Sequence, residues 1–170
     1  AMEMPRPEYP RPQSARAEWL CLNGEWEFEI DAGDSGLERG LLTRPLSGRI
    51  RVPFCPESVL SGVGLTDFHN AVWYRRRVTV PEGWGDARVL LHFQAVDYDA
   101  TVWVNGQEAG RHRGGFTPFT VELGEGVGGG TALEIVVRAR DYTREWQPVG
   151  KQSQWHGNRG CHYTRTTGIW

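Results

Sequence analysis

The sequence predicts an all-β domain, an antiparallel β-sandwich of the jelly-roll type. About eight short runs alternate apolar and polar residues or are rich in β-branched and aromatic side chains, and turn signals separate them. The 170 residues include 22 glycines and 10 prolines, which favours many turns over long helices. No stretch shows the 3.6-residue period of an amphipathic helix for more than a turn or two. This length is typical of one compact domain.

The first predicted strands lie between residues 25 and 93. Residues 25–30 alternate acidic and apolar side chains, which indicates one buried face and one hydrated face. Residues 50–52 form a short run that Pro53 ends, and residues 72–80 form a longer run rich in aromatic and β-branched residues. Residues 88–93 place Val, Leu and Phe on one side of a further strand.

A hairpin follows, and two more strands come after it. Residues 99–104 and 107–111 are extended runs joined by Asn105-Gly106. An Asn-Gly pair between such runs predicts a type I′ turn, because both central positions of that turn need positive φ. Residues 116–123 and 133–138 complete the set.

The two ends of the chain have a different character. Residues 1–18 are rich in proline and arginine and predict an N-terminal arm, either laid over the surface or disordered. Residues 19–170 are then the sandwich domain. Within it, residues 141–168 show no alternation, and an irregular stretch of that length is often a functional loop. The final Gly168-Ile169-Trp170 looks like the opening of a strand or linker towards further domains.

Charge and cysteine usage exclude several classes of function. The net charge is −2, so we expect no nucleic-acid partner. The apolar runs are too short for a membrane span, and nothing resembles a signal peptide, so we expect a cytoplasmic protein. The three cysteines have no metal-ligand spacing. His156 and His162, with Cys161 beside the latter, match no zinc pattern, so neither metal nor cofactor is predicted.

No self-sufficient catalytic site is visible in the sequence. The serines lie outside any G-x-S-x-G motif, and the glycines near residue 128 lack the Lys-Ser/Thr of a P-loop. Asp97 and Asp99 would share one face of a strand and could serve as the acid/base pair of a glycosidase. A structural or ligand-orienting role for these two carboxylates is favoured over catalysis.

The aromatic and polar loop after residue 141 has the composition of a sugar-binding loop. Indole rings stack on the C–H faces of pyranoses, and Asn, Gln, His and Arg side chains bind the hydroxyls. Trp146 and Trp155 lie in polar segments, so they are candidates for sugar contact. The alternative is that they pack the loop down. Trp73 and Trp103 lie in predicted strands and are assigned to sheet packing.

An ordered set of motifs resembles the N-terminal jelly-roll domain of glycoside hydrolase family 2, the family of β-galactosidases, β-glucuronidases and β-mannosidases. The motifs run in the family's order from Trp19 to Trp170. They are Leu22-Asn23-Gly24-Glu25-Trp26-Glu27-Phe28, Val52-Pro53-Phe54, Val72-Trp73-Tyr74-Arg75-Arg76, the stretch from Asp97 to Gly106, Gly114-Gly115-Phe116-Thr117-Pro118-Phe119, and the stretch from Tyr163 to Trp170.

The resemblance implies a galactose-binding-domain-like sandwich followed by an immunoglobulin-like domain and a (β/α)8 barrel that carries both catalytic glutamates. This chain alone would then have no catalytic residues and be inactive, and whether it is an enzyme is left open. Asn70 matches the Asn before the Trp-Tyr-Arg strand of the family. His162 stands where some members have a sugar-binding Asp, and a neutral imidazole cannot accept two hydroxyl hydrogen bonds as a carboxylate does. Arg165 lies in the same motif.

We therefore predict a non-catalytic sugar-binding domain that shapes the substrate pocket of a downstream barrel, which would cleave terminal β-glycosides with retention. The predicted sugar contacts are Asn70, His162, Trp155, Trp146 and Arg165. The predicted partners are a carbohydrate and the downstream domains of the same polypeptide. The alternatives are a stand-alone carbohydrate-binding module and a purely structural interdomain scaffold.

Overall fold

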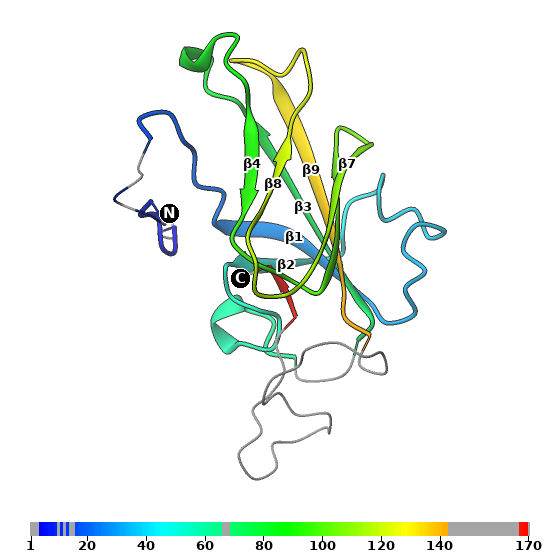
Figure 1. The fold of residues 1–170 in the computed structure, drawn as a ribbon. Helices are drawn as coiled ribbons and strands as arrows, with labels where there is room; N and C mark the ends of the chain where they lie inside the picture. The colour runs from blue at the N-terminus through cyan, green and yellow to red at the C-terminus, as the bar shows by residue number, and fades with distance from the viewer. Residues whose placement is uncertain are drawn as a thin grey trace.

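A computed structural model shows an all-β fold (Figure 1). The structure describes residues 4–9, 11, 13, 16–65, 69–142 and 167–169. Within those ranges the chain forms ten strands and two short 3-10 turns, Val59–Ser61 and Glu82–Trp84. Every strand pairing is antiparallel.

The main layer is a six-stranded sheet in the order β2-β1-β3-β9-β6-β7. Its strands are β2 (Gly48–Val52), β1 (Gly24–Asp31), β3 (Ala71–Thr79), β9 (Ala132–Arg140), β6 (Asp99–Val104) and β7 (Gln107–Arg113). β3 and β9 form the longest pairing, with Ala71 opposite Arg140 and Thr79 opposite Ala132. This central pair fixes which residues reach each end of the sandwich.

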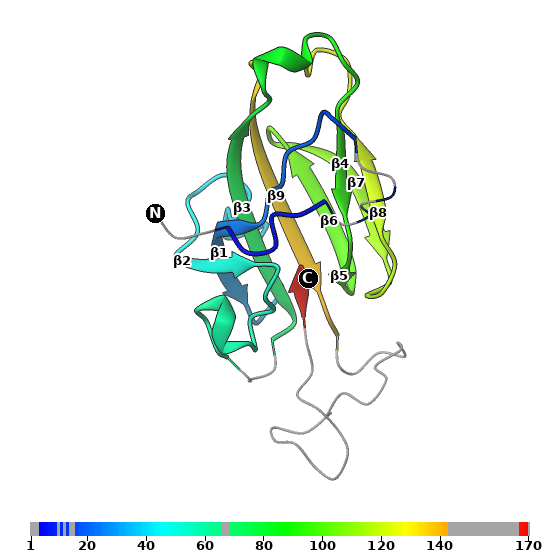
Figure 2. The same ribbon diagram turned by 90° about the vertical axis from the view of Figure 1, so that its left-hand side faces the viewer.

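Two smaller sheets complete the sandwich. β4 (Leu90–Phe93) pairs with β8 (Phe119–Glu122), and this pair forms a second layer, which lies in front of the main sheet in Figure 1 and on the right in Figure 2. β5 (Val96–Asp97) pairs with β10 (Gly168–Ile169), the red strand of Figure 2. β10 therefore brings the end of the chain back to the end of the sandwich where β3 begins.

The main core lies between the layers. Trp26, Phe28 and Tyr74 meet edge to face, with ring centroids 6.4 Å and 5.3 Å from the tyrosine ring. All three side chains are buried, and rings of this size dominate the apolar area that a core removes from water. The alternation that predicted residues 25–30 as a strand reflects this burial, because Trp26 and Phe28 both point into the core.

A second apolar cluster lies on the opposite face of the main sheet. Trp73 and Trp103 stack there with centroids 5.4 Å apart, and the loop between β1 and β2 covers them with Leu41 and Leu46. Arg75 is buried beneath the same loop and donates to the backbone carbonyls of Leu41 (3.0 Å), Leu42 (2.7 Å) and Arg44. The assignment of both tryptophans to sheet packing is confirmed.

The described part of the N-terminal arm contacts the start of the domain. The Asn23 side-chain amide donates to the carbonyls of Pro5 (3.2 Å) and Arg6 (3.1 Å). The rings of Tyr9 and Trp19 meet edge to face at 4.9 Å. These contacts attach the arm beside the first residues of β1.

The predicted strands are confirmed, with small differences at their ends. The Asn-Gly turn is present, with φ of 50° at Asn105 and 81° at Gly106. The strand predicted over residues 116–123 is narrower, since β8 covers only Phe119–Glu122. The sequence does not predict β5, because a two-residue strand carries no periodicity.

The first testable prediction concerns Arg75. Arg75→Met keeps much of the apolar stem but leaves three carbonyls of the covering loop without their donor. We expect a loss of about 2–4 kcal/mol in the free energy of unfolding, measured by urea denaturation. Arg77→Met on the same strand is the control, because Arg77 is exposed, and it should change stability by less than about 0.5 kcal/mol. Equal effects would contradict the structural role of Arg75.

Candidate functional site

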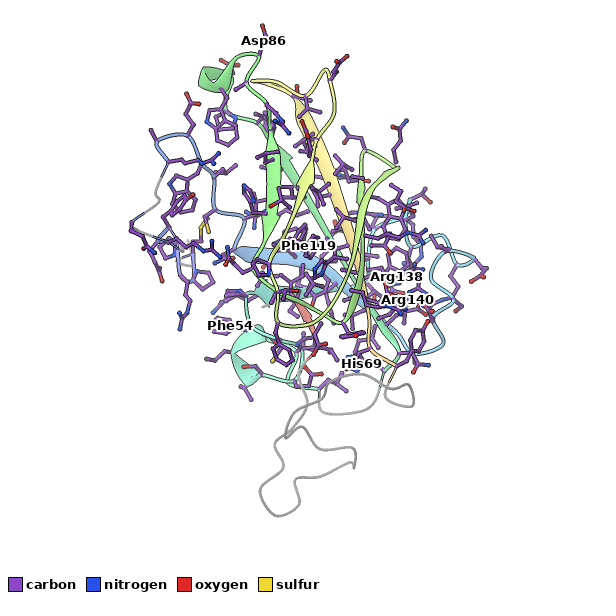
Figure 3. The ribbon with its side chains drawn as sticks, viewed as in Figure 1. Phe54, His69, Asp86, Phe119, Arg138 and Arg140 are labelled. Carbon is purple, nitrogen blue, oxygen red and sulfur yellow. The ribbon has the colours of Figure 1, made fainter. Side chains whose placement is uncertain are left out.

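Buried polar side chains gather at the end of the sandwich where β10 returns. They are Glu57, His69, Asp97, Asp141 and Thr167, here called the base cluster, and each is at most 9% exposed. Figure 3 shows His69 at this end, below the strands of the main sheet. Buried polar groups are costly unless they are hydrogen-bonded, so their concentration at one place marks a site that the fold is built to hold.

A chain of hydrogen bonds joins Glu57, Thr167 and His69. The Thr167 hydroxyl donates to Glu57 Oε1 at 2.8 Å, and the Thr167 amide donates to Glu57 Oε2 at 3.2 Å. His69 Nε2 lies 3.0 Å from the same hydroxyl. Because a hydroxyl has only one proton, Thr167 accepts from His69, which places a proton on Nε2. His69 Nε2 is also 3.9 Å from Glu57 Oε1.

The loop after β2 places Glu57 in this arrangement. Its turns close on themselves, since the Ser58 amide donates to Cys55 O at 2.9 Å and the Leu65 amide to Pro56 O at 3.0 Å. The Ser58 side chain then caps the Val59–Ser61 turn by accepting from the Leu60 amide. Hydrogen bonds within this loop therefore hold Glu57 in position, in addition to its contact with Thr167.

Asp97 occupies the other side of β10. It lies opposite Gly168 in the β5–β10 pairing. Gly115 packs against its carboxylate so closely that a Cβ at that position would lie 2.6 Å from Oδ1. Burial raises the pKa of Asp97 to about 7, with further contributions from the charges of Asp141 and Glu57. Asp97 therefore changes its charge near neutral pH.

Tyr74 links the base cluster to the core. Its hydroxyl accepts a hydrogen bond from the Ile169 amide at 3.3 Å, and burial raises the pKa of the phenol. Gly168, between Thr167 and Ile169, has a φ of 84°, and a Cβ there would lie 2.0 Å from the Tyr74 hydroxyl oxygen. A glycine is therefore required where β10 passes over Tyr74.

The base cluster suits binding and orientation rather than bond cleavage. Asp97 and Asp99 lie on different strands, and Asp99 pairs with Arg113 at 3.1 Å. The carboxylates that influence Asp97 are instead Asp141 and Glu57. Within the described ranges, no group of His, Cys, Asp and Glu side chains is arranged to hold a metal ion.

The predicted sugar contacts divide into one described residue and four that lie outside the described residues. Asn70 is exposed, and its side-chain amide donates to Ala32 O at 2.8 Å. Its backbone carbonyl accepts from the Asp141 amide at 3.0 Å, which places Asn70 beside the base cluster. The four others are Trp146, Trp155, His162 and Arg165. The role of all five residues in sugar binding stays a prediction.

Sequence reasoning missed Glu57, His69, Asp141 and Thr167. One signal could have found two of them: His69 comes just before the strand at residue 71 and Asp141 just after the strand that ends at residue 140. Because β3 and β9 are antiparallel and Ala71 lies opposite Arg140, these polar residues fall at the same end of the sheet. No local pattern links Glu57 with Thr167, which is 110 positions away.

Apolar side chains are exposed next to the base cluster. Val59 is 86% exposed and Leu60 63% exposed, on the turn that follows Glu57. This pair is here called the base patch. Adjacent exposed apolar residues on a structured turn are typical of surfaces that contact another part of a protein. No helix among the described residues has the length and apolar character needed to cross a membrane.

Comparisons with known proteins agree on one family. The family described as "Glycosyl hydrolases family 2, sugar binding domain" matches residues 60–157. A β-glucuronidase of Paenibacillus borealis is 34% identical over 104 residues, covering 60% of this chain and 17% of the relative. The Homo sapiens β-glucuronidase is 34% identical over 126 residues, covering 68% of this chain and 19% of the relative.

Solved structures give the same result. A Lactobacillus rhamnosus β-glucuronidase matches with a TM-score of 0.62 at 30% identity, covering 71% of this chain and 20% of that one. An uncultured Clostridium sp. β-glucuronidase matches with a TM-score of 0.61 at 33% identity, covering 69% of this chain and 21% of that one. The chain thus spans about a fifth of the length of the proteins it resembles.

The second prediction concerns the pH dependence of stability. Burial raises the pKa of Asp97 to about 7 in the fold, well above that of an aspartate in an unfolded chain, so the folded state binds the proton more tightly. This contribution to stability is fully present below about pH 4 and is lost as the pH rises through 7. Between pH 5 and pH 8 the free energy of unfolding of the unmodified chain should therefore fall by about 2–3 kcal/mol relative to Asp97→Asn.

Denaturation at several pH values measures this difference. Asp86→Asn is the matched control, because Asp86 is exposed at the far end of the sandwich (Figure 3). The control should follow the unmodified chain at every pH. Parallel curves for the unmodified chain and Asp97→Asn would show that Asp97 does not titrate near neutral pH.

Proposed function

Because the chain belongs to the sugar-binding domains of glycosyl hydrolase family 2, we propose that it forms the non-catalytic side of a glycosidase sugar pocket. The bond-breaking groups would come from a (β/α)8 barrel, which would follow the sandwich and an immunoglobulin-like domain in a longer polypeptide. The chain matches only about a fifth of each β-glucuronidase, which supports the assignment of sugar binding to this sandwich and of cleavage to another domain.

The observation that carries the proposal is the position of the base cluster. Asp141 and Thr167 come at the two ends of the segment 142–166, and both belong to the cluster. Glu57 binds Thr167 with two hydrogen bonds, and the Asp141 amide binds the Asn70 carbonyl. The cluster therefore fixes the residues that flank the segment containing Trp146, Trp155, His162 and Arg165.

The same geometry argues against catalysis by the base cluster itself. A glycosidase needs two carboxyl groups that face the scissile bond, about 5–5.5 Å apart in retaining enzymes and about 6.5–9.5 Å apart in inverting ones. Glu57, Asp97 and Asp141 are all buried, at 9%, 7% and 6% exposure. Glu57 is further occupied by Thr167. We assign these carboxylates to the support of the pocket.

The proposed substrate is a terminal β-linked sugar, with a β-glucuronide as the first candidate. This choice rests on the four similar proteins reported above, each of which is a β-glucuronidase. Asn70 and His162 would orient the sugar hydroxyls, Trp146 and Trp155 would stack on its apolar face, and Arg165 would pair with the carboxylate of a uronic acid.

The base patch is the proposed contact with the rest of the polypeptide. Val59 and Leu60 follow Glu57 directly, so a domain packed on them would lie beside the base cluster. Burying these two side chains removes apolar surface from water, which stabilises the contact by about 25 cal/mol per Å². The pocket would then form between the sandwich and the domain that covers the patch.

The third prediction tests the division of labour. The 170-residue chain alone should not hydrolyse p-nitrophenyl β-glucuronide, whereas the longer polypeptide should. A titration of the chain with glucuronate, followed by tryptophan fluorescence, should show millimolar binding or none, because half a pocket leaves most hydroxyls in water. Micromolar binding would instead identify a stand-alone carbohydrate-binding module, and turnover by the chain alone would overturn the proposal.

The fourth prediction tests the base patch. Leu60→Asp places a charge on the proposed contact, so it should lower the activity and the Tm of the longer polypeptide. It should leave the Tm of the 170-residue chain unchanged, because Leu60 is exposed there. Leu37→Asp is the control, since Leu37 is 48% exposed on the loop after β1. Identical behaviour of both variants in the longer polypeptide would exclude the patch as a contact.

A further inference from the structure

A group of arginines on the outer face of the main sheet is separate from the base cluster. Arg138 and Arg140 lie two residues apart on β9, and Figure 3 shows them beside each other on the side of the loop between β1 and β2. Asp34, on that loop, and Thr101, on β6, belong to the same place. These four residues are here called the arginine-pair site.

The strand register brings the members of this site together. Thr101 lies opposite Arg138, and Asp99 lies opposite Arg140. Residues opposite each other on neighbouring antiparallel strands have Cβ atoms about 4.5–5.5 Å apart. Asp34 reaches both arginines from the loop between β1 and β2. Its Oδ1 lies 4.0 Å from Arg138 Nη1 and its Oδ2 lies 3.5 Å from Arg140 Nη1.

Arg138 is held in place by the tryptophan pair. Its guanidinium carbon lies 5.6 Å from the ring centroid of Trp73 and 5.4 Å from that of Trp103. The residue is only 6% exposed. Burial, with the neighbouring charge of Arg140, lowers the pKa of Arg138 from its usual value. Two like charges are thus kept close together, and one of them is buried.

The charges around the site do not balance. Arg111 is paired with Glu108 through two hydrogen bonds of 2.7 Å and 2.9 Å, and Arg113 is paired with Asp99 at 3.1 Å. Arg138 and Arg140 then have Asp34 as their shared acidic partner, and Asp34 also accepts from the Tyr142 hydroxyl. Counted over the described residues around the site, four arginines therefore face three carboxylates, Glu108, Asp99 and Asp34, which leaves one positive charge in excess.

Several buried hydrogen-bonding atoms of the site also have no partner in the part of the protein that the structure describes. Among the described residues, the buried polar side-chain atoms that have no hydrogen-bond partner in the protein include Arg138 Nε, Arg140 Nε, Thr101 Oγ1 and Asp34 Oδ1. Three of these four atoms are donors, and two of the three belong to cations. Buried polar atoms without a partner are rare, and a group of them indicates a bound water or ion.

We propose that the arginine-pair site binds a small monovalent anion through Arg138 Nε, Arg140 Nε and the Thr101 hydroxyl, and that this anion is chloride when the protein is in a chloride solution. An anion accepts from the three donors and also offsets the excess positive charge counted among the described residues. A water molecule could accept from donors and donate to Asp34 Oδ1, but it offsets no charge. Arg138 and Thr101 are only 6% and 1% exposed, so a monatomic anion reaches their unpartnered atoms more easily than a phosphate or a carboxylate would. The bound anion would fix the loop between β1 and β2 on the sheet.

The test uses the 170-residue chain and measures its Tm as sodium chloride replaces sodium gluconate at constant ionic strength. Gluconate is too bulky to reach these buried atoms. An anion that binds only the folded chain raises the Tm with its concentration. We expect a rise of about 2–6 °C between 0 and 300 mM chloride. A Tm that is the same in both salts would overturn the proposal.

Two matched pairs of variants assign the effect to the site. Thr101→Val keeps the shape of the side chain and removes the hydroxyl, so it should weaken the chloride dependence of the Tm. Arg140→Gln removes one of the two cations and should abolish it. Thr79→Val and Arg77→Gln change exposed residues of the same types on β3, so both should keep the full dependence. An undiminished dependence in Thr101→Val and Arg140→Gln would place the anion elsewhere.

Crystals grown in sodium bromide give a readout that does not depend on stability. Bromide replaces chloride at such sites and scatters anomalously. The proposal requires an anomalous peak within hydrogen-bond distance of Arg138 Nε and Arg140 Nε. Density for a water molecule there, without anomalous signal, would contradict the proposal and assign the unpartnered atoms to hydration.

Discussion

The two hydrogen bonds between the Glu57 carboxylate and Thr167 are the interaction on which the rest of this structure depends. A two-residue strand such as β10 has too few ladder hydrogen bonds to hold itself on β5. The Glu57 carboxylate adds two hydrogen bonds and Tyr74 adds a third, all of them shielded from water. Charge-assisted hydrogen bonds in such surroundings are stronger than neutral ones on a surface. The end of the chain is therefore fixed by side chains rather than by a ladder.

Buried charges are concentrated in two parts of the molecule, the base cluster and the arginine-pair site. At the base, burial raises the pKa of Asp97 to about 7, and the charges of Asp141 and Glu57 add to the rise. Glu57 in turn lies 3.9 Å from the imidazole of His69. On the outer face, Arg138 and Arg140 share one acidic partner. Buried charges are rarely kept in a fold for stability alone, because their desolvation can cost as much as their attraction returns. We therefore associate both places with ligands.

The sequence alone predicted the strands and the family but not the centre of the candidate site. Alternation at Trp26 and Phe28 and the Asn105-Gly106 turn are local signals, and local signals suffice for a strand or a hairpin. Glu57 and Thr167 meet across 110 positions, which no period or motif spacing records. Asp97 and Asp99 look equivalent in the sequence, yet one is buried beside Gly115 and the other pairs with Arg113. Only the tertiary fold separates their roles.

We propose that this sandwich contributes sugar binding without the chemistry of cleavage. The decisive measurement is a crystal structure of the longer polypeptide with glucuronic acid bound. We expect the sugar next to the base cluster, with Asn70 and residues between 143 and 166 on its hydroxyls and both carboxylates of cleavage from outside residues 1–170. A sugar bound away from the base cluster, or a cleaving carboxylate supplied by this chain, would contradict it.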